Sequence, residues 1–383
     1  MEVSVTAAND ILEASDGLPL YREFSQGPVL AISISIPTKG RRANFDVAQV
    51  RLQSAIRSRV GSQVSIKKTL NLVEYVPWSH FTPVHATSTA TTTSYSAKVS
   101  FDVSGKPHKQ SVMLPSTSLD GSTYVTQHTA LNDRHLVRGT CETYSWVNVD
   151  FVQNGISVYQ TKEPVELEVK PQHMTIASPK TIRGGAAAMC RTVVSGLRSR
   201  WAASPAAVTA EVSLPSDEEL HLVDNKNPAT NKTYTSVELP LHVAFSGLSA
   251  PVVEAISQSG GVRCDVETKW YSTRSFNTSA QASAGHTEPN RTVIASQLIS
   301  TQGSAVIFPP LARPSNGASA EEKLSTMSLL HLVLPKSASL PSVQTDLLKV
   351  EYELELKYTF QLDGYKSPLF LKGKAKVDCC LSS

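Results

Sequence analysis

The sequence predicts an all-β protein made of two tandem antiparallel β-sandwiches with an immunoglobulin-like sandwich architecture. Several segments alternate apolar and polar residues with a period of two, and turns rich in Gly, Pro and Ser separate them. The second half of the chain repeats this pattern after a connector of different composition. With 383 residues and 40% hydrophobic side chains, the chain is long enough for two domains with their own cores.

The clearest alternating segment is residues 347–360, LLKVEYELELKYTF. Its apolar side chains share one parity: Val350, Tyr352, Leu354, Leu356, Tyr358 and Phe360. Burying each of them stabilises the fold by about 1.5–3 kcal/mol as an upper estimate. A slip of one residue would bury glutamates and lysines instead, so the pattern fixes the register of the strand. Long antiparallel strands with one face in water are typical of sandwiches.

Residues 1–171 are predicted to form the N-terminal sandwich. Alternation predicts strands over residues 29–36, 65–76, 95–103, 140–152, 156–159 and 165–169. Residues 47–60 fit either a strand or a helix. Asn154-Gly155 predicts a two-residue hairpin turn, because both residues tolerate a positive φ.

An aromatic segment, YVPWSHFTPVH, follows residue 74 and contains Trp78 and His80 between Pro77 and Pro83. The prolines interrupt ladder hydrogen bonding, so the segment is predicted to be a loop. Two interpretations of its rings remain open. They either fold back onto the sheet or form a contact surface or the lip of a pocket.

Residues 172–205 are predicted to be a linker, with a short helix over 186–201, because the period of two is lost there. The segment carries four arginines: Arg183, Arg191, Arg198 and Arg200. It is either a hinge in water or a patch for an anionic partner, since clustered arginine binds phosphate and carboxylate.

Residues 206–383 are predicted to form the C-terminal sandwich. Strands are expected over residues 208–214, 237–245, 262–270, 293–299, 330–334, 347–360 and 369–377. Pro240 indicates that the second of these lies at a sheet edge.

The composition argues against several classes of function. The sequence has no nucleotide-binding glycine loop, HExxH or GxSxG motif, so we expect no cofactor, and its histidines lack the spacing of a metal site. A net charge of +3 without a basic stripe argues against a nucleic-acid partner. No apolar run approaches about 18 residues, so no transmembrane segment is expected. Five cysteines without CxxC spacing, and no apparent secretory signal, favour a cytoplasmic protein.

Three segments resemble the fungal arrestin-like family, which has the arrestin fold of two tandem sandwiches. GTCETYSWVNVDFVQNGISVYQTKEPVELEV, residues 139–169, looks like the closing hairpin of the family's first sandwich. VETKWYSTRSF, residues 266–276, looks like its strand exit with tyrosine and arginine. LPKSASLPSVQTDLLKVEYELELKYTF, residues 334–360, looks like its penultimate strand.

This resemblance implies a cytosolic scaffold that binds membrane-protein tails and often recruits a ubiquitin ligase. Ligase-recruiting members carry a Pro-Pro-x-Tyr motif. Here Pro309-Pro310 is followed by Leu311 and Ala312, so ligase recruitment by this motif is not expected.

Two functional hypotheses follow. The first is a binding scaffold that takes a peptide or membrane-protein tail, by strand addition at a sheet edge or by arginine contacts to acidic or phosphorylated residues. The alternative is a cofactor-free cyclase or isomerase, for instance of the Diels-Alder type, that holds a hydrophobic small molecule in a sandwich or between the two sandwiches. The candidate ligand-binding residues are Trp78, His80, Tyr144, Trp146, Trp270, Tyr271 and Arg274.

Overall fold

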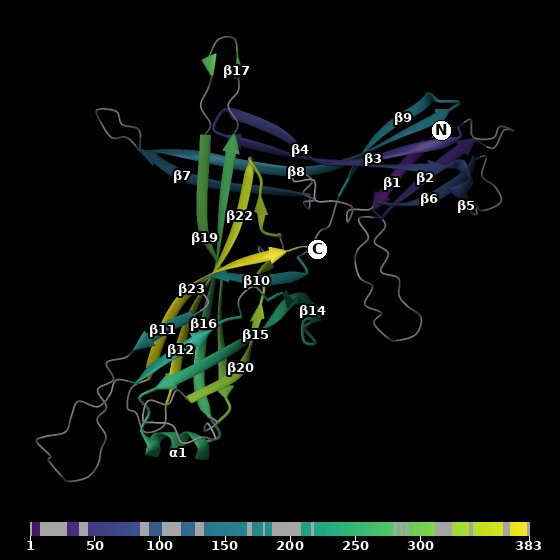
Figure 1. Cartoon of the computed structure of the whole chain (residues 1–383). Coiled ribbons are helices and arrows are strands. Elements are labelled where there is room, and N and C mark those ends of the chain that lie inside the picture. Colours follow the sequence, from purple (N-terminus) through teal and green to yellow (C-terminus); the bar gives the residue numbers. More distant parts are fainter. Residues whose placement is uncertain are drawn as a thin grey trace, which may run out of the picture.

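The computed structural model confirms an all-β architecture of antiparallel sheets (Figure 1). It describes residues 2–7, 29–37, 45–84, 92–101, 116–126, 134–166, 171–178, 181–185, 208–215, 218–278, 282–283, 286–287, 291–310, 324–336, 340–362 and 368–380. Four sheets, here named A to D, form the body of the described chain, and a two-stranded hairpin of β17 (Ala282–Ser283) and β18 (His286–Thr287) stands apart from them.

The first half of the chain forms sheets A and B. Sheet A has the order β1 (Glu2–Ala7), β2 (Val29–Pro37), β6 (Thr92–Ser100), β5 (Thr82–Val84). Sheet B has the order β4 (Gln63–Pro77), β3 (Val47–Val60), β8 (Arg134–Gln153), β7 (Thr117–Thr126), with β9 (Ile156–Val165) also paired to β8. Residues 47–60 are therefore a strand.

The second half forms sheets C and D. Sheet C has the order β13 (Leu220–His221), β10 (His173–Ser178), β23 (Leu369–Cys380), β22 (Leu348–Gln361), β16 (Val262–Thr278), β19 (Arg291–Phe308), with β21 (Val343–Gln344) paired to β22. Sheet D has the order β11 (Thr181–Gly185), β12 (Thr209–Ser213), β15 (Thr233–Ser246), β14 (Val223–Lys226), with β20 (Leu324–Val333) also paired to β15.

Strand β22 confirms the alternation that predicts the fold. All six of its predicted core residues, from Val350 to Phe360, are buried. Phe360 packs edge-on against Phe245 of sheet D, with ring centroids 5.3 Å apart. The one buried charge on the strand is Glu355, which pairs with Lys372 at 3.1 Å.

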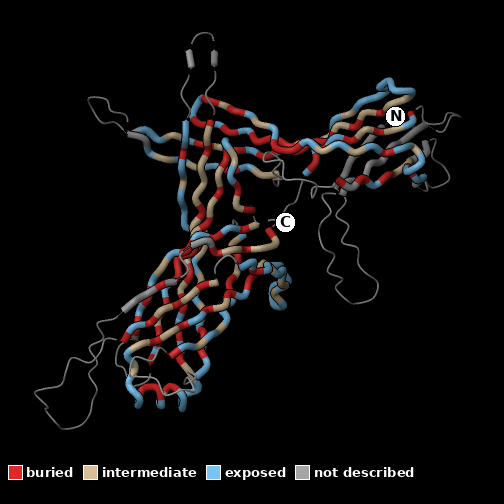
Figure 2. Tube along the Cα trace, viewed as in Figure 1, coloured by how far each residue is buried: buried red, intermediate tan, exposed pale blue. Residues whose placement is uncertain are grey.

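One face of sheet B, the inner face, carries two separate cores. Strand parity places Ala48, Val50 and Leu52 on this face, where they pack with Ala97 and Val99 of sheet A. Further along β3, residues of the same parity join the core of sheets C and D instead. Figure 2 shows the buried residues of both cores in red.

At its second core, sheet B packs closely against one end of sheet C. Phe276 of β16 lies directly against Gly121 and Gly139, where an added Cβ would come within 2.8 Å of its ring. Thr278 donates a buried hydrogen bond of 2.9 Å to Gln63. Sheet C therefore connects the two halves of the described chain by face-to-face packing as well as along the backbone.

Some local predictions are wrong. The segment 237–245, predicted at a sheet edge from Pro240, lies in β15, which pairs with β12, β14 and β20. The range 172–205 is wrong as a continuous linker, because β10 pairs with β23 and β11 pairs with β12. The short helix predicted over 186–201 lies outside the described residues, as do residues 167–170 of the strand predicted over 165–169. The α-helix that the structure does describe, α1 (Ala250–Gln258), was not predicted. The sequence does carry its signals: Ser249 at the N-cap, Pro251 in the first turn, and buried Val252, Val253 and Ile256.

The turn at Asn154-Gly155 is confirmed, with φ values of 51° and 78°. The aromatic segment is partly regular rather than a loop. β4 runs through Pro77, and a 3₁₀ turn, η1 (Trp78–His80), leads to β5. In the described part of the chain, no helix has the length and apolar character needed to cross a membrane.

Candidate partner-binding surface

Trp78 is partly buried and packs against the core rather than forming the lip of a pocket. Its ring stacks on Phe81 with centroids 5.7 Å apart and meets Phe45 and Tyr95 at 5.1 and 4.9 Å. His80, at the end of η1, is exposed. The structure thus favours the interpretation in which the aromatic segment folds back onto the sheet.

The three candidates on β16 also differ in their surroundings. Trp270 is fully buried in the core, and its Nε1 has no hydrogen-bond partner in the described part of the chain. Tyr271 lies on the opposite face of the strand, with Lys374 Nζ 5.1 Å from its ring centroid. Arg274 is half-buried, and its Nε makes no hydrogen bond to a described residue. The seven candidates therefore do not line one cavity.

Tyr144 and Trp146 lie together on the outer face of sheet B, the face that neither core uses. Their rings stack with centroids 5.5 Å apart, and Lys162 Nζ lies 4.7 Å above the Trp146 ring. Ala55, which pairs with Tyr144 in register, is only 1% exposed. Its small side chain lets the two rings lie close to the sheet.

A hydrogen-bonded network fixes the Trp146 ring in place. Gln53 Oε1 accepts from Trp146 Nε1 at 3.0 Å and from Asn148 Nδ2 at 2.8 Å. Gln53 Nε2 in turn donates to Asn71 Oδ1 at 2.9 Å. The network spans β8, β3 and β4, so it holds one arrangement of side chains across three strands.

A separate set of hydrogen bonds holds the exposed Tyr75. Its hydroxyl accepts from Gln49 Nε2 at 2.8 Å, and Gln49 Oε1 accepts from Arg51 at 2.7 Å. Tyr75 remains 63% exposed and Ile66, further along β4, is 61% exposed. These side chains present apolar surface to solvent while their polar groups are held by neighbours.

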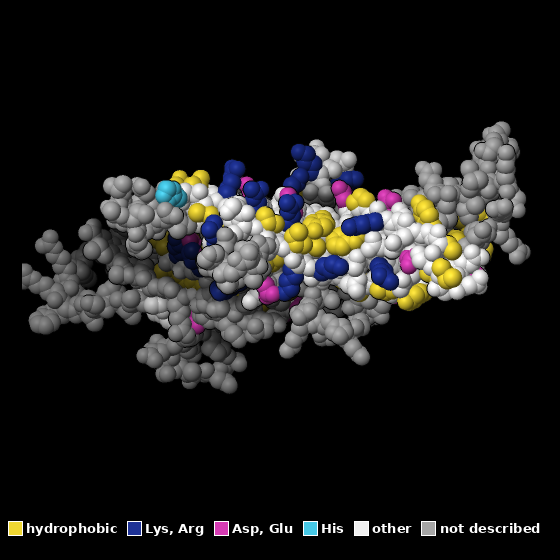
Figure 3. All heavy atoms as spheres, turned by 90° about the horizontal axis from the view of Figure 1, so that it is seen from above, with side chains coloured by type: hydrophobic (Ala, Val, Ile, Leu, Met, Phe, Trp, Pro, Cys, Tyr) yellow, Lys and Arg dark blue, Asp and Glu magenta, His cyan; other side chains and the backbone are white. Residues whose placement is uncertain are grey.

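Basic side chains surround this apolar surface. Among the residues whose side chains are described, strand parity places six basic residues on the outer face: Arg51, Arg57, Arg59, Lys68, Arg138 and Lys162. It carries three acidic residues, Asp120, Glu142 and Asp150, and Glu142 lies 3.8 Å from Arg57. Figure 3, a view from above, shows dark blue and yellow side chains alternating along sheet B. We call this surface, from Ile66, Tyr75, Tyr144 and Trp146 to the six basic residues, the ring-cation face.

No family model matches the chain, and no curated protein matches it. The arrestin-like resemblance thus stays a prediction.

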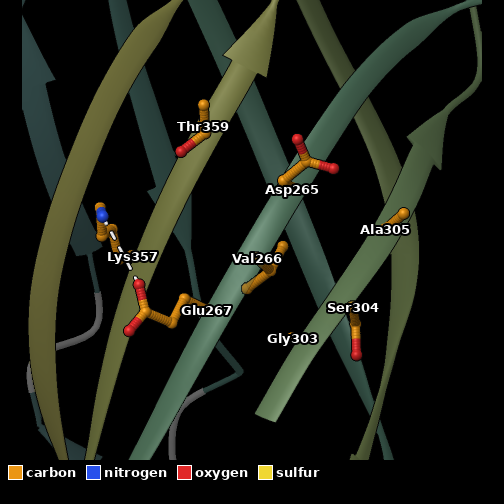
Figure 4. Close-up of a pocket in the computed structure, with 8 residues that line it drawn as sticks. All are labelled: Asp265, Val266, Glu267, Gly303, Ser304, Ala305, Lys357 and Thr359. Atoms are coloured by element: carbon orange, nitrogen blue, oxygen red, sulfur yellow. Dashed lines mark hydrogen bonds and ion pairs between the residues drawn. The ribbon is translucent and has the colours of Figure 1, made fainter. Parts of the chain in front are cut away.

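A depression lies on the outer face of sheet C. It encloses about 360 Å³ beside Gly303 and Ala305, whose small side chains leave space on β19 (Figure 4). Its polar groups are already paired: Lys357 lies 3.5 Å from Glu267, and a hydrogen bond from Lys269 lowers the pKa of the Glu267 carboxyl. None of the residues predicted from the sequence lines it.

The described residues offer little for covalent or metal chemistry. Burial raises the pKa of the Cys141, Cys264 and Cys379 thiols to about 12, so they are protonated and poor nucleophiles at neutral pH. No group of His, Cys, Asp and Glu in the described ranges has the geometry of a metal site.

The predicted arginine patch is only partly located. Arg183 lies on β11, and its side chain is not described. Arg191, Arg198 and Arg200 lie outside the described residues. The basic residues of β3 were not singled out from the sequence, although Arg51, Arg57 and Arg59 share one parity in a segment that fitted both strand and helix.

Proposed function

We propose that this chain is an arrestin-like binding scaffold whose ring-cation face binds an acidic or phosphorylated segment of a partner protein. The observation that carries the proposal is the combination of exposed rings and excess basic side chains on one sheet face. Arginine forks match carboxylate and phosphate groups, and Tyr, Trp and Arg are enriched where proteins bind one another. The tail of a membrane protein is the partner class that the family resemblance suggests.

The charge on the face supports an anionic segment in particular. Arg57 has a carboxylate neighbour, whereas Arg51 bonds to an amide and Arg59 Nε donates to the backbone carbonyl of Gly61. Such charges attract an anionic segment over a distance set by the Debye length, about 8 Å at physiological salt. Binding of this kind weakens as salt rises.

A random copolymer of glutamate and tyrosine, carrying a fluorophore, is a suitable probe because it combines carboxylates for the basic side chains with rings for the aromatic ones. We expect it to bind the full chain, and the Arg51→Glu/Arg57→Glu double variant to weaken binding by about tenfold or more. The matched control is Arg263→Glu/Lys376→Glu, which makes the same charge change on exposed residues of sheet C. Equal losses in both double variants would reduce the effect to net charge and contradict the proposal.

The cyclase hypothesis lacks a comparable observation. It requires the aromatic candidates to line one cavity, whereas Trp270 lies inside the core and Tyr144 on the outer face of another sheet. Incubation with polyene or terpenoid substrates tests it directly, since a cyclase changes the rate or the stereochemistry of product formation.

A further inference from the structure

The edge strand β19 is a second surface without an obvious partner. It is 18 residues long and pairs with β16 along one side, and no described strand pairs with its other side. From Thr292 to Phe308 it contains no charged residue and no proline. Edge strands usually carry lysine, proline or a covering segment, because unpaired backbone groups recruit other strands.

Half of this edge is covered by β20. The side chain of Gln302 hydrogen-bonds both the backbone N–H and the carbonyl of Val333. Ser328 Oγ donates to the Ile307 carbonyl at 3.0 Å, and Thr326 Oγ1 donates to the Pro309 carbonyl at 2.9 Å. These contacts close sheet C onto sheet D from Gln302 to Pro309.

The other half of the edge, from Thr292 to Leu298, has no such cover among the described residues. The register with β16 skips Ile299, so a bulge separates the two halves of β19. In the uncovered half Ile294 is 56% exposed and Leu298 is 51% exposed, on the outer face of the sheet. This half is a regular strand with exposed apolar side chains, and its edge is not occupied by any strand in the described part of the chain.

Sheet B overhangs this open edge. Gly121 of β7 lies against Ala295 of β19, where an added Cβ would come within 2.6 Å. The residues of β7 after Gly121, and those of β8 paired with them, therefore run past the edge (Figure 1). Val137 and Thr123 on the inner face of this overhang are half-buried. The space beside β19 is thus bounded on one face by sheet B.

The overhang favours a single extended segment over a second copy of this chain as the occupant of the edge of β19. If a second copy paired antiparallel through β19, the twofold axis would be perpendicular to the sheet, and both copies of sheet B would lie on the same face. The two overhangs would then compete for the same space. A single extended segment meets no such obstacle.

We propose that residues 292–298 of β19 accept an extended, uncharged segment of a partner protein as an additional strand of sheet C. The segment alternates, placing apolar side chains beside Ile294 and Leu298 and small side chains beneath the overhang of β7 and β8. Main-chain hydrogen bonds to β19 provide the affinity, and side-chain contacts on the two faces of sheet C provide the selectivity. This site is independent of the ring-cation face, which takes an acidic segment.

The probe is a capped, fluorescent peptide of alternating valine and threonine, compared with one in which glutamate replaces each threonine. We expect the uncharged peptide to bind the full chain and to slow backbone amide exchange in residues 292–298. Ile294→Lys should weaken binding by about fivefold or more, through loss of a cross-strand apolar contact. The matched control is Leu329→Lys, since Leu329 is also 56% exposed and lies on the edge strand β20.

Four results would overturn the proposal. They are unchanged amide exchange in β19, equal binding of the glutamate peptide, equal losses in the two lysine variants, or dimerisation of the full chain that Ile294→Lys abolishes. The last result would assign the edge to a second copy. None of them bears on the ring-cation face, whose test uses a different probe and different variants.

Discussion

The two faces of sheet B are made by the same strands but differ in chemistry. The inner face buries aliphatic and aromatic side chains under sheets A and C, and its middle is marked by a buried hydrogen bond of 2.6 Å between Ser54 and Ser145. The outer face presents rings and basic side chains that are ordered by amide hydrogen bonds. In these strands one parity is buried and stabilises the fold, whereas the side chains of the other parity remain on the outer face.

The largest expected difference between the faces is in stability. Phe151 is fully buried and packs against Phe45 with centroids 4.8 Å apart, so Phe151→Ala should lower the free energy of unfolding by about 3–5 kcal/mol. Tyr75→Ala on the outer face should change it by about 0.5 kcal/mol or less. Urea unfolding measures both, and similar losses would mean that the outer face is also a core.

The second largest expected effect on stability is at the contact between sheets B and C. Gly139→Val would place side-chain atoms against the Phe276 ring, so we expect a loss of about 1–3 kcal/mol in the free energy of unfolding. Gly303→Val is the control, because an added Cβ there meets no atom within 4 Å. If Gly139→Val is as well tolerated as the control, sheets B and C do not pack as described.

The amide network should have a smaller effect. Gln53→Leu removes the acceptor of both Trp146 and Asn148, which should lower the free energy of unfolding by about 1–2 kcal/mol. Gln160→Leu, an exposed change on the neighbouring β9, is the control. Binding of the glutamate-tyrosine copolymer should fall in Gln53→Leu alone, since only that change releases the Trp146 ring.

The last expected effect, which is absent at neutral pH, is a pH dependence from the inner face. The pKa of Cys141 is about 12 in the folded chain, against an ordinary value near 9, so the unfolded chain loses its thiol proton first. Stability from this thiol is therefore complete below about pH 9 and declines between pH 9 and 12. Cys141→Ala should show a shallower decline than the unmutated chain when urea unfolding is repeated across this range. An unchanged slope would contradict the burial of this thiol.

Much of the fold follows from local sequence, because a period of two is visible wherever one face of a strand is exposed to solvent. The segment 347–360 is the clearest case, and β22 has its predicted buried parity. β10 and β11 were missed because six-residue and five-residue strands are too short to show alternation within a segment rich in Ala, Gly and Arg. Their strand state depends on distant partners, β23 and β12.

The candidate surface was predicted only in part, for a related reason. Tyr144 and Trp146 stand out in the sequence, but their partner Gln53 lies 93 residues from Trp146. Neither residue type nor spacing indicates that β3 and β8 are neighbours. Trp270 is not a surface residue, because it lies in the core that residues of sheets B, C and D share, and a sequence does not show which tryptophans another sheet covers.

The central claim, that the ring-cation face binds acidic segments, is tested most directly by zero-length cross-linking of the copolymer's carboxylates to lysines, followed by mass-spectrometric mapping. We predict that the cross-links concentrate at Lys68 and Lys162, on the outer face of sheet B. Cross-links concentrated at Lys372 and Lys374, which are exposed on sheet C, would contradict the account.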